Sequence, residues 1–166
     1  MNKTKKILII GGGQAAAYAS KEIRSIDTSS DITIISDEKY LPYERPPLSK
    51  DYILDKVEFK NLLFFPETFY KENNINFIGN TKINKVDFNN KKICSALKNY
   101  DYDKLLIATG SSNRHLVING QTILSEENII YLRDFDESNN LKNKINEAKN
   151  ITIIGGGFIG LEIASS

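Results

Sequence analysis

The architecture of this chain follows from one segment, KKILIIGGGQAAAYA, which runs from Lys5 to Ala19. An apolar run, Ile7 to Ile10, stops at three glycines, and a segment of small residues with helical character follows. This order is typical of a buried strand that turns sharply into a helix. The segment contains the motif G-x-G-x-x-A, whose special positions are Gly11, Gly13 and Ala16.

Each special position of this motif has a physical role at a phosphate-binding turn. The first glycine permits the tight turn, the second lets a pyrophosphate approach the backbone, and Ala16 keeps the helix close to the strand. The free N–H groups at the start of the helix attract anionic phosphate. Because any tight strand-to-helix turn favours glycine, the motif alone does not separate a dinucleotide site from an ordinary turn.

The next elements supply the context that such a site needs. We expect a helix from Ala15 to Ser25 and a second buried strand from Ile32 to Ile35, which together complete a βαβ unit. Asp37 and Glu38 follow that strand, about 20 positions beyond the glycines, where an acid can accept hydrogen bonds from a ribose diol. A solvated strand end would explain one acid, but the combined pattern predicts dinucleotide binding.

Composition limits the other function classes. The 166 residues include 40% hydrophobic residues, enough for a core, while 22 basic and 21 acidic side chains give a net charge of +1. This balance predicts no binding to nucleic acid, and we expect no membrane span because no apolar run approaches about 18 residues. The basic MNKTKK start precedes only four apolar residues, so we expect no secretory signal and a cytoplasmic protein.

Cysteine and histidine are too rare for several kinds of site. Cys94 is the single cysteine, which excludes an internal disulfide and any Cys-x-x-Cys redox or zinc motif. His115 is the single histidine, which leaves no histidine cluster for a metal and no spare base for a nucleophile. The sequence therefore predicts no metal site.

The remaining pattern completes the expected fold. Three prolines between Tyr40 and Lys50 indicate an ordered loop or pre-helical turn. Further along the chain we expect a helix from near Pro66, a strand Ile75 to Ile78, a hairpin of Thr81 to Phe88 with Lys91 to Ser95, a strand within Tyr102 to Gly110, a strand Asn128 to Leu132 and a helix Glu137 to Lys149. These elements predict an α/β Rossmann-like domain with a central parallel sheet and an antiparallel β meander.

A second strand, turn and helix pattern closes the sequence as ITIIGGGFIGLEIASS. We expect a strand from Ile151 to Ile154 and a second phosphate-binding motif at Gly155, Gly157 and Gly160. Two such patterns in one chain predict the start of a second Rossmann unit.

The segment PYERPPLSK, Pro42 to Lys50, resembles a signature of the FAD-dependent ferredoxin, rubredoxin and putidaredoxin reductases. These enzymes form a branch of the pyridine nucleotide-disulfide oxidoreductase superfamily that also includes apoptosis-inducing factor. The resemblance implies that the first glycine motif binds FAD and the second binds NAD(P)H. It also implies electron transfer from NAD(P)H through FAD to a small iron-sulfur protein of the ferredoxin or rubredoxin class. The C-x4-C pair of the disulfide branch is absent from the sequence.

The resemblance assigns roles to individual residues. Lys50 would lie near the reactive edge of the flavin, and Glu162 would pair with it, so both are candidate catalytic residues. The residues implied to bind a cofactor are Gly11, Gly13, Gln14, Ala15, Ala16, Asp37, Glu38, Arg45, Lys50, Ile83, Ala108, Thr109, Gly110, Arg133, Gly155, Gly157 and Gly160.

The resemblance also implies a division into domains. Residues 1–118 would form the first part of an FAD-binding domain, and residues 119–166 would begin an NAD(P)-binding domain that is cut short. We therefore expect a fragment of such a reductase. Two alternatives stay open at this point, a nucleotide-binding interaction or signalling protein of the apoptosis-inducing-factor type and an inactive truncated chain.

Overall fold

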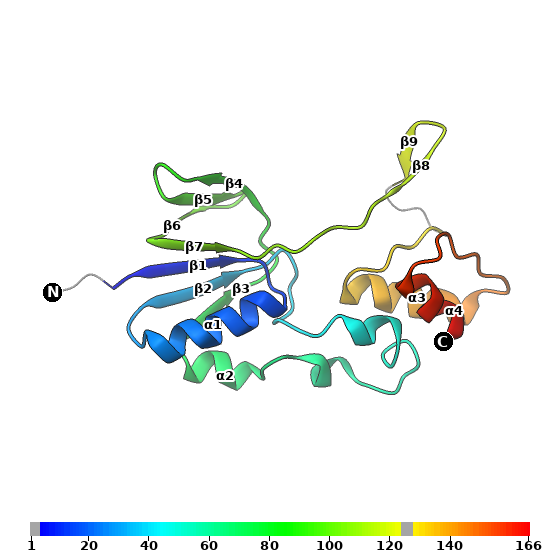
Figure 1. Cartoon of the computed structure of the whole chain (residues 1–166), viewed down its shortest axis with the longest axis horizontal. Helices are drawn as coiled ribbons and strands as arrows, with labels where there is room; N and C mark the ends of the chain where they lie inside the picture. Colours follow the sequence, from blue (N-terminus) through cyan, green and yellow to red (C-terminus); the bar gives the residue numbers. More distant parts are fainter. Residues whose placement is uncertain (1–3, 124–127) are drawn as a thin grey trace. The chain divides into compact units, whose positions relative to one another are not determined.

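The computed structural model describes residues 4–123 and 128–166. Its contacts divide the chain into two compact units, each built from two stretches of sequence (Figure 1). The first unit comprises Met1–Tyr43 and Leu63–Gly110, and the second comprises Glu44–Leu62 and Ser111–Ser166.

A four-stranded parallel sheet forms the centre of the first unit, with strand order β3-β2-β1-β7. Its strands are β1 (Lys6–Ile10), β2 (Asp31–Ile35), β3 (Ile75–Ile78) and β7 (Lys104–Ile107). The helices of this unit are α1 (Gln14–Ile26), which connects β1 to β2, and α2 (Glu67–Glu72), which precedes β3. The β1-α1-β2 connection is the predicted βαβ unit.

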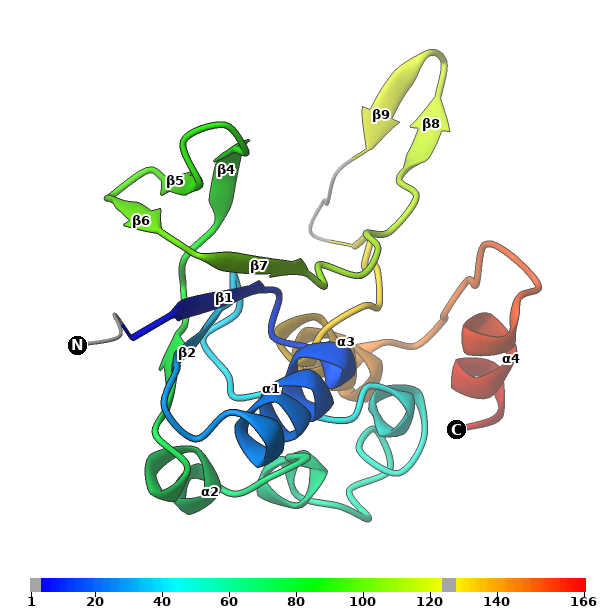
Figure 2. The ribbon, with the colours of Figure 1, turned by 60° about the vertical axis from the view of Figure 1, so that its left-hand side comes forward.

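Side chains alternate between the two faces of this sheet because successive strand residues point to opposite sides. On one face Ile9, Ile32 and Ile34 pack against Ala16 of α1 and Tyr70 of α2. On the other face, Leu8, Ile10 and Ile35 pack with Ile93 and Tyr102. Figures 1 and 2 show the helices on one side of the sheet and the antiparallel strands on the other. Both faces are therefore covered, as expected for a parallel sheet.

The antiparallel sheet contains β4 (Ile83–Asp87), β5 (Lys92–Ser95) and β6 (Asn99–Asp101), in the order β4-β5-β6. The hairpin of β4 and β5 confirms the one predicted around Asn89 and Asn90. Its pairing is irregular between Ile83 and Lys85, where a β-bulge shifts the register. Strand β6 was not predicted, because its three residues are too short to show alternation.

Arg24, near the end of α1, forms hydrogen bonds with two neighbouring loops. Its guanidinium donates to four backbone carbonyls, those of Asn73 at 2.7 Å, Asp27 at 2.9 Å, Ser30 at 2.8 Å and Asn74 at 3.0 Å. These carbonyls belong to the α1–β2 connection and to the segment between α2 and β3. One side chain therefore joins the entry points of two adjacent strands.

Within the described residues, the second unit contains two 3₁₀ helices, two α-helices and one β-hairpin. Its elements are the 3₁₀ helices η1 (Pro46–Ser49) and η2 (Phe59–Leu62), strands β8 (Leu116–Ile118) and β9 (Gln121–Ile123), and helices α3 (Phe135–Glu147) and α4 (Phe158–Ser165). Helix α3 begins at an N-cap, Asp134, whose side chain accepts from the N–H of Glu137 at 2.9 Å. Phe135 of α3 stacks at 4.0 Å from Phe59 and 5.1 Å from Tyr52, measured between ring centroids.

Two predicted strands of the second unit are wrong. Residues Asn128 to Leu132 form a turn and a single bridge, and no strand is assigned there. Residues Ile151 to Ile154 are likewise not paired, although they are apolar. A strand needs a hydrogen-bonded neighbour, and no strand within the described residues pairs with this segment.

The other predicted elements of both units are confirmed with boundaries that differ by a few residues. The predicted domain boundary between residues 118 and 119 falls inside the second compact unit and separates β8 from β9. The predicted boundary divides the chain by the cofactor that each part binds, which the packing of the chain does not test. The boundary therefore stays a prediction. Of the helices that the structure describes, none is both long enough and apolar enough to span a membrane.

Candidate functional site

The carboxyl ends of three parallel strands bring the predicted phosphate and ribose residues of the first unit to one edge. Ile10 of β1 is in register with Ile35 of β2 and with Ile107 of β7. The residues directly after these strands therefore lie next to one another. The backbone confirms this arrangement, since the N–H of Gly11 donates to Ile35 at 2.8 Å and that of Ala108 to Ile10 at 2.8 Å. Open α/β sheets bind ligands at this edge.

The two special glycines of the first motif have different surroundings. Gly11 has a φ of +113°, and a Cβ there would overlap the carbonyl oxygen of Ala108. Gly13, with a φ of −96°, is the N-cap of α1, and a Cβ there would meet nothing within 4 Å. Gly11 is thus required by the packing of the protein itself. Gly13 leaves space in front of the N-terminus of a helix, and helix N-termini in general attract anionic groups such as phosphate.

The residues that follow Gly13 divide between surface and core. Gln14 and Ala15 are exposed in the first turn of α1. Ala16 is completely buried and packs in the core between α1 and the sheet. This position confirms its predicted packing role, and its side chain is not open to a ligand.

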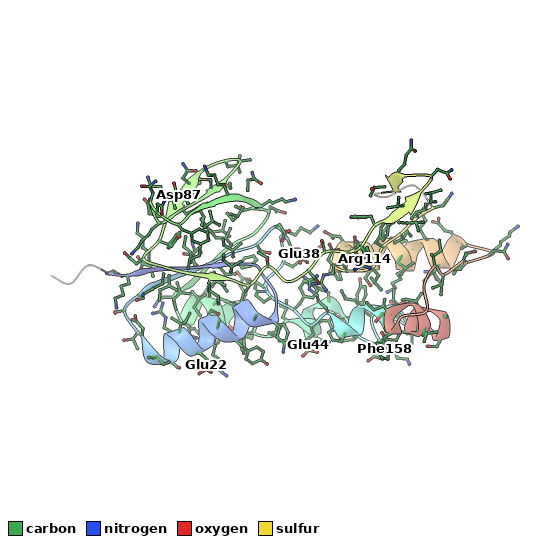
Figure 3. The ribbon with its side chains drawn as sticks, turned by 45° about the horizontal axis from the view of Figure 1, so that its top comes forward. Glu22, Glu38, Glu44, Asp87, Arg114 and Phe158 are labelled. Carbon is green, nitrogen blue, oxygen red and sulfur yellow. The ribbon has the colours of Figure 1, made fainter. Side chains whose placement is uncertain are left out.

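The two predicted ribose acids follow β2 but differ in exposure. Asp37 is exposed, whereas Glu38, labelled in Figure 3, is partly buried. Glu38 accepts a hydrogen bond at 2.5 Å from the hydroxyl of Tyr43. The hydroxyl of Ser36 accepts from the N–H of Glu38 at 3.1 Å, which fixes the backbone between the strand and the acids. Both carboxylates therefore stand at the carboxyl end of β2, as predicted.

The remaining predicted residues of the first unit lie on two other segments. Ile83 begins β4, beside the β-bulge, where the backbone departs from regular pairing. Ala108 is partly buried, Thr109 and Gly110 are exposed, and Gly110 has a φ of +69°. Small residues after β7 leave the carboxyl edge of the sheet open.

In the second unit the structure brings two predicted arginines together. The guanidinium of Arg45 donates from Nη1 to the backbone carbonyl of Arg133 at 2.8 Å. Arg133 donates from Nε to the carbonyl of Ser111 at 2.9 Å. Both guanidinium groups are thereby oriented by backbone acceptors.

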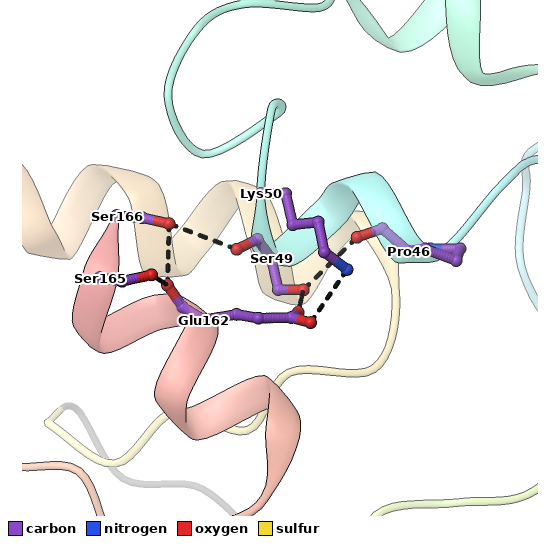
Figure 4. A network of polar contacts seen from close by, with 6 residues as sticks. All are labelled: Pro46, Ser49, Lys50, Glu162, Ser165 and Ser166. Atoms are coloured by element: carbon purple, nitrogen blue, oxygen red, sulfur yellow. Dashed lines mark hydrogen bonds and ion pairs between the residues drawn. The ribbon is translucent and has the colours of Figure 1, made fainter.

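The predicted pair of Lys50 and Glu162 also forms within the second unit (Figure 4). The Nζ of Lys50 lies 3.0 Å from Oε1 of Glu162, and the hydroxyl of Ser49 donates to Oε2 of the same carboxylate at 2.5 Å. The hydrogen bond from Ser49, followed by that from Lys50, lowers the pKa of Glu162 below its usual value. We did not predict Ser49, because a serine in a proline-rich segment gives no sequence signal of its partner.

The second glycine motif repeats the backbone geometry of the first. Gly155 has a φ of +109°, close to that of Gly11, and Gly157 is the N-cap of α4, as Gly13 is of α1. A Cβ at Gly157 would meet nothing within 4 Å, whereas one at Gly160 would stand 2.8 Å from the carbonyl oxygen of Gly155. The turn and the start of its helix therefore form although the strand before them is unpaired.

The sequence of nearly the whole chain matches one protein family. Residues 5–166 match the profile of the pyridine nucleotide-disulphide oxidoreductases. The chain belongs to this family. Membership confirms the predicted relationship to the pyridine nucleotide-disulfide oxidoreductases and the predicted Rossmann-like fold.

Individual relatives show which members of the family this chain is similar to. The rubredoxin-NAD(+) reductase of Pseudomonas putida is 35% identical over 161 residues, which cover 96% of this chain and 41% of that protein. Among solved structures, a putidaredoxin reductase in covalent complex with putidaredoxin has a TM-score of 0.90 at 28% identity, covering 99% of this chain and 40% of the other. A ferredoxin reductase from Rhodopseudomonas palustris has a TM-score of 0.87 at 36% identity, covering 97% and 39%.

These matches confirm the predicted resemblance to the ferredoxin, rubredoxin and putidaredoxin reductases. They also show that the chain spans about two fifths of the length of the curated relatives it matches. The matched part contains both glycine motifs, which stand at the two ends of the chain.

Proposed function

We propose that this chain carries the FAD-binding part of an NAD(P)H-dependent reductase that passes electrons to a small iron-sulfur protein. The single observation that carries the proposal is the contrast between Gly11 and Gly13 in the first unit. Gly11 is closed in by the backbone of Ala108, while Gly13 faces open space at the start of α1. A glycine that the packing does not require, at a helix N-terminus, suits a ligand that approaches the backbone closely.

The chemistry of the neighbouring residues fits FAD. The first N–H groups of α1 would hold the diphosphate, because the first turn of a helix leaves N–H groups without intrahelical partners. The carboxylates of Asp37 and Glu38 stand at the end of the next strand, where they would accept from the ribose hydroxyls. These 166 residues contain one cysteine, Cys94, so no disulfide forms within them.

Lys50 would act as the cation of the redox chemistry. Its ammonium pairs with Glu162 but its side chain keeps 49% of its surface exposed, so further N–H donors remain available. A cation held in place stabilises negative charge that develops on a bound group during reduction. Bound FAD would supply the exchange between two-electron oxidation of NAD(P)H and one-electron transfer to the iron-sulfur protein.

The names of the relatives support the class of electron acceptor. They include reductases of rubredoxin and ferredoxin, and one solved relative is a covalent complex with putidaredoxin. We propose that the second motif, Gly155, Gly157 and Gly160, contributes to NAD(P)H binding because it repeats the geometry of the first. A cytoplasmic location is proposed from the sequence pattern alone.

Titration with FAD tests the proposal. FAD added to the purified chain is expected to bind, which quenches or shifts flavin fluorescence and changes the visible absorption spectrum. The substitution Gly13→Ala is expected to weaken binding at least about tenfold, because the new methyl group occupies the space that we assign to the phosphate.

A matched control uses a glycine of the second motif. A Cβ added at Gly156 would also meet nothing within 4 Å, and we assign this residue no role toward FAD. Gly156→Ala is therefore expected to leave FAD affinity unchanged. Equal affinities of the parent and Gly13→Ala chains would contradict the proposed phosphate site, and a folded chain that binds no FAD would contradict the proposed cofactor.

A further inference from the structure

Ser49 makes a contact that the expected lysine–glutamate pair does not require. The residue is 5% exposed, and its hydroxyl lies 2.5 Å from Oε2 of Glu162 and 3.4 Å from the carbonyl oxygen of Pro46. A hydroxyl has only one proton to donate. The much shorter distance to Glu162 assigns that proton to the carboxylate. Figure 4 draws both contacts of the hydroxyl.

The contact divides the two oxygens of Glu162 between two donors. Oε2 accepts from Ser49, and Oε1 accepts from the ammonium of Lys50 at 3.0 Å. Hydrogen bonds to the charged form of a carboxylate favour that form. The pKa of Glu162 is accordingly lowered, with the Ser49 hydrogen bond as the largest cause and Lys50 as the next.

Ser49 is itself held by a rigid element. It ends η1, whose first residues, Pro46 and Pro47, fix their own φ angles. The carbonyl of Leu48, the residue before it, accepts a buried hydrogen bond at 2.8 Å from the hydroxyl of Ser138 in α3. The backbone that carries the Ser49 side chain is therefore held by contacts that do not involve Glu162.

We propose that Ser49 is a positioning residue that fixes the carboxylate of Glu162, so that Glu162 in turn fixes the ammonium of Lys50. The exposed lysine side chain is flexible, and one fixed carboxylate oxygen limits where its charge lies. The importance of this placement for electron transfer rests on the proposed function. The hold of Ser49 on Glu162 itself is a property of the chain without any cofactor.

Carboxyl-carbon NMR of the chain without FAD tests this proposal. Glutamate labelled with ¹³C at the side-chain carboxyl gives one titrating signal for Glu162, which is identified by its loss in Glu162→Gln. Ser49→Ala is expected to move the titration midpoint of Glu162 upward. Ser49→Thr keeps a hydroxyl and is expected to retain the low midpoint, which separates the hydrogen bond from packing.

Ser165→Ala is the matched control. The hydroxyl of Ser165 donates to the backbone carbonyl of Glu162 at 2.9 Å and not to its carboxylate, so its loss is expected to leave the midpoint unchanged. An unchanged midpoint in Ser49→Ala, or an equal upward shift in Ser165→Ala, would overturn the proposal. FAD titration of the same samples tests the proposed function separately, because absence of FAD binding does not alter the NMR result.

Discussion

Gly11 lies so close to Ala108 that a Cβ on Gly11 would stand 2.6 Å from the carbonyl carbon of Ala108. The contact joins the turn after β1 to the end of β7, the two adjacent strands that are farthest apart in sequence within the sheet. The φ of +113° at Gly11 adds a second requirement for glycine, since side chains strain this conformation. The first glycine of the motif is therefore fixed by the fold, whether or not a ligand binds.

Gly11→Ala is expected to destabilise the first unit by at least about 2 kcal/mol, because it combines backbone strain with overlap in a packed strand end. Urea unfolding followed by far-UV circular dichroism measures the change. Gly13→Ala, at an unstrained φ in open space, is expected to cost only about 1 kcal/mol, which is typical of an N-cap substitution to alanine. Similar losses of stability in the two variants would contradict the distinction between a structural and a ligand-facing glycine.

Arg24→Met is expected to lower the free energy of unfolding by about 2–3 kcal/mol. The substitution leaves four backbone carbonyls without the donor that joins them, and unpaired partly buried acceptors are costly. Thermal unfolding and urea unfolding both measure this effect.

Two further variants show whether the geometry or the charge of Arg24 matters. Arg24→Lys is expected to restore little stability, because one ammonium cannot match the planar spread of guanidinium donors. Glu22→Gln changes an exposed charge on the same helix and is expected to have an effect below about 0.5 kcal/mol. Full rescue by lysine would show that charge alone explains the role of Arg24.

The predictable part of the fold is the part with strong local patterns. Strand β3 was predicted with its observed bounds, and β1 and β2 within one residue, because short, mostly apolar runs bounded by polar residues or glycine are clear signals. The unpaired segment Ile151–Ile154 shows the limit of this reasoning. Its sequence resembles a strand as closely as Ile7–Ile10 does, but pairing depends on a neighbour that no local pattern supplies.

One missed element did carry a signal. Asn119 and Gly120 connect β8 to β9 with φ angles of +50° and +78°, the conformation that Asn-Gly favours in a two-residue hairpin. The residues of the candidate site were likewise predictable only where the local sequence carries a signal. Glycine turns and strand-end acids were predictable from spacing, whereas Ser49 became visible only when tertiary structure placed it beside Glu162.

Asp27, which follows α1, is expected to make the stability of the chain depend on pH. Its carboxylate accepts hydrogen bonds from the hydroxyl of Ser30 and from the N–H groups of Ser29 and Ser30. These hydrogen bonds lower the pKa of Asp27 far below the ordinary value, and the bond from the Ser30 hydroxyl has the largest effect. A lowered pKa in the folded state means that the contribution to stability is present above about pH 4 and is lost as the pH falls toward the folded-state pKa. Asp27→Asn is therefore expected to lower stability at pH 7.

The acid range supplies the control for this prediction. The difference in unfolding free energy between the parent chain and Asp27→Asn is expected to shrink steadily as the pH falls from about 5 to about 2, when measured by urea unfolding at each pH. Asp31→Asn, which removes an exposed carboxylate at the start of β2, is the control variant and is measured in the same way. A difference that stays constant with pH would exclude the carboxylate charge as the source of the effect.

Tyr70→Phe is expected to stabilise the first unit by about 1 kcal/mol. Tyr70 is 3% exposed and packs beside Phe69, and its hydroxyl has no hydrogen-bond partner among the described residues. Burial raises the pKa of this hydroxyl to about 12, as expected for a group removed from water. Removing a buried donor that is unsatisfied lowers the cost of folding while the ring keeps its packing.

Tyr18, in the same aromatic cluster, keeps 46% of its surface exposed, so Tyr18→Phe should change stability by less than about 0.5 kcal/mol. Urea unfolding of both variants at pH 7 makes the comparison, and a loss of stability in Tyr70→Phe would mean that the hydroxyl is satisfied by bound water.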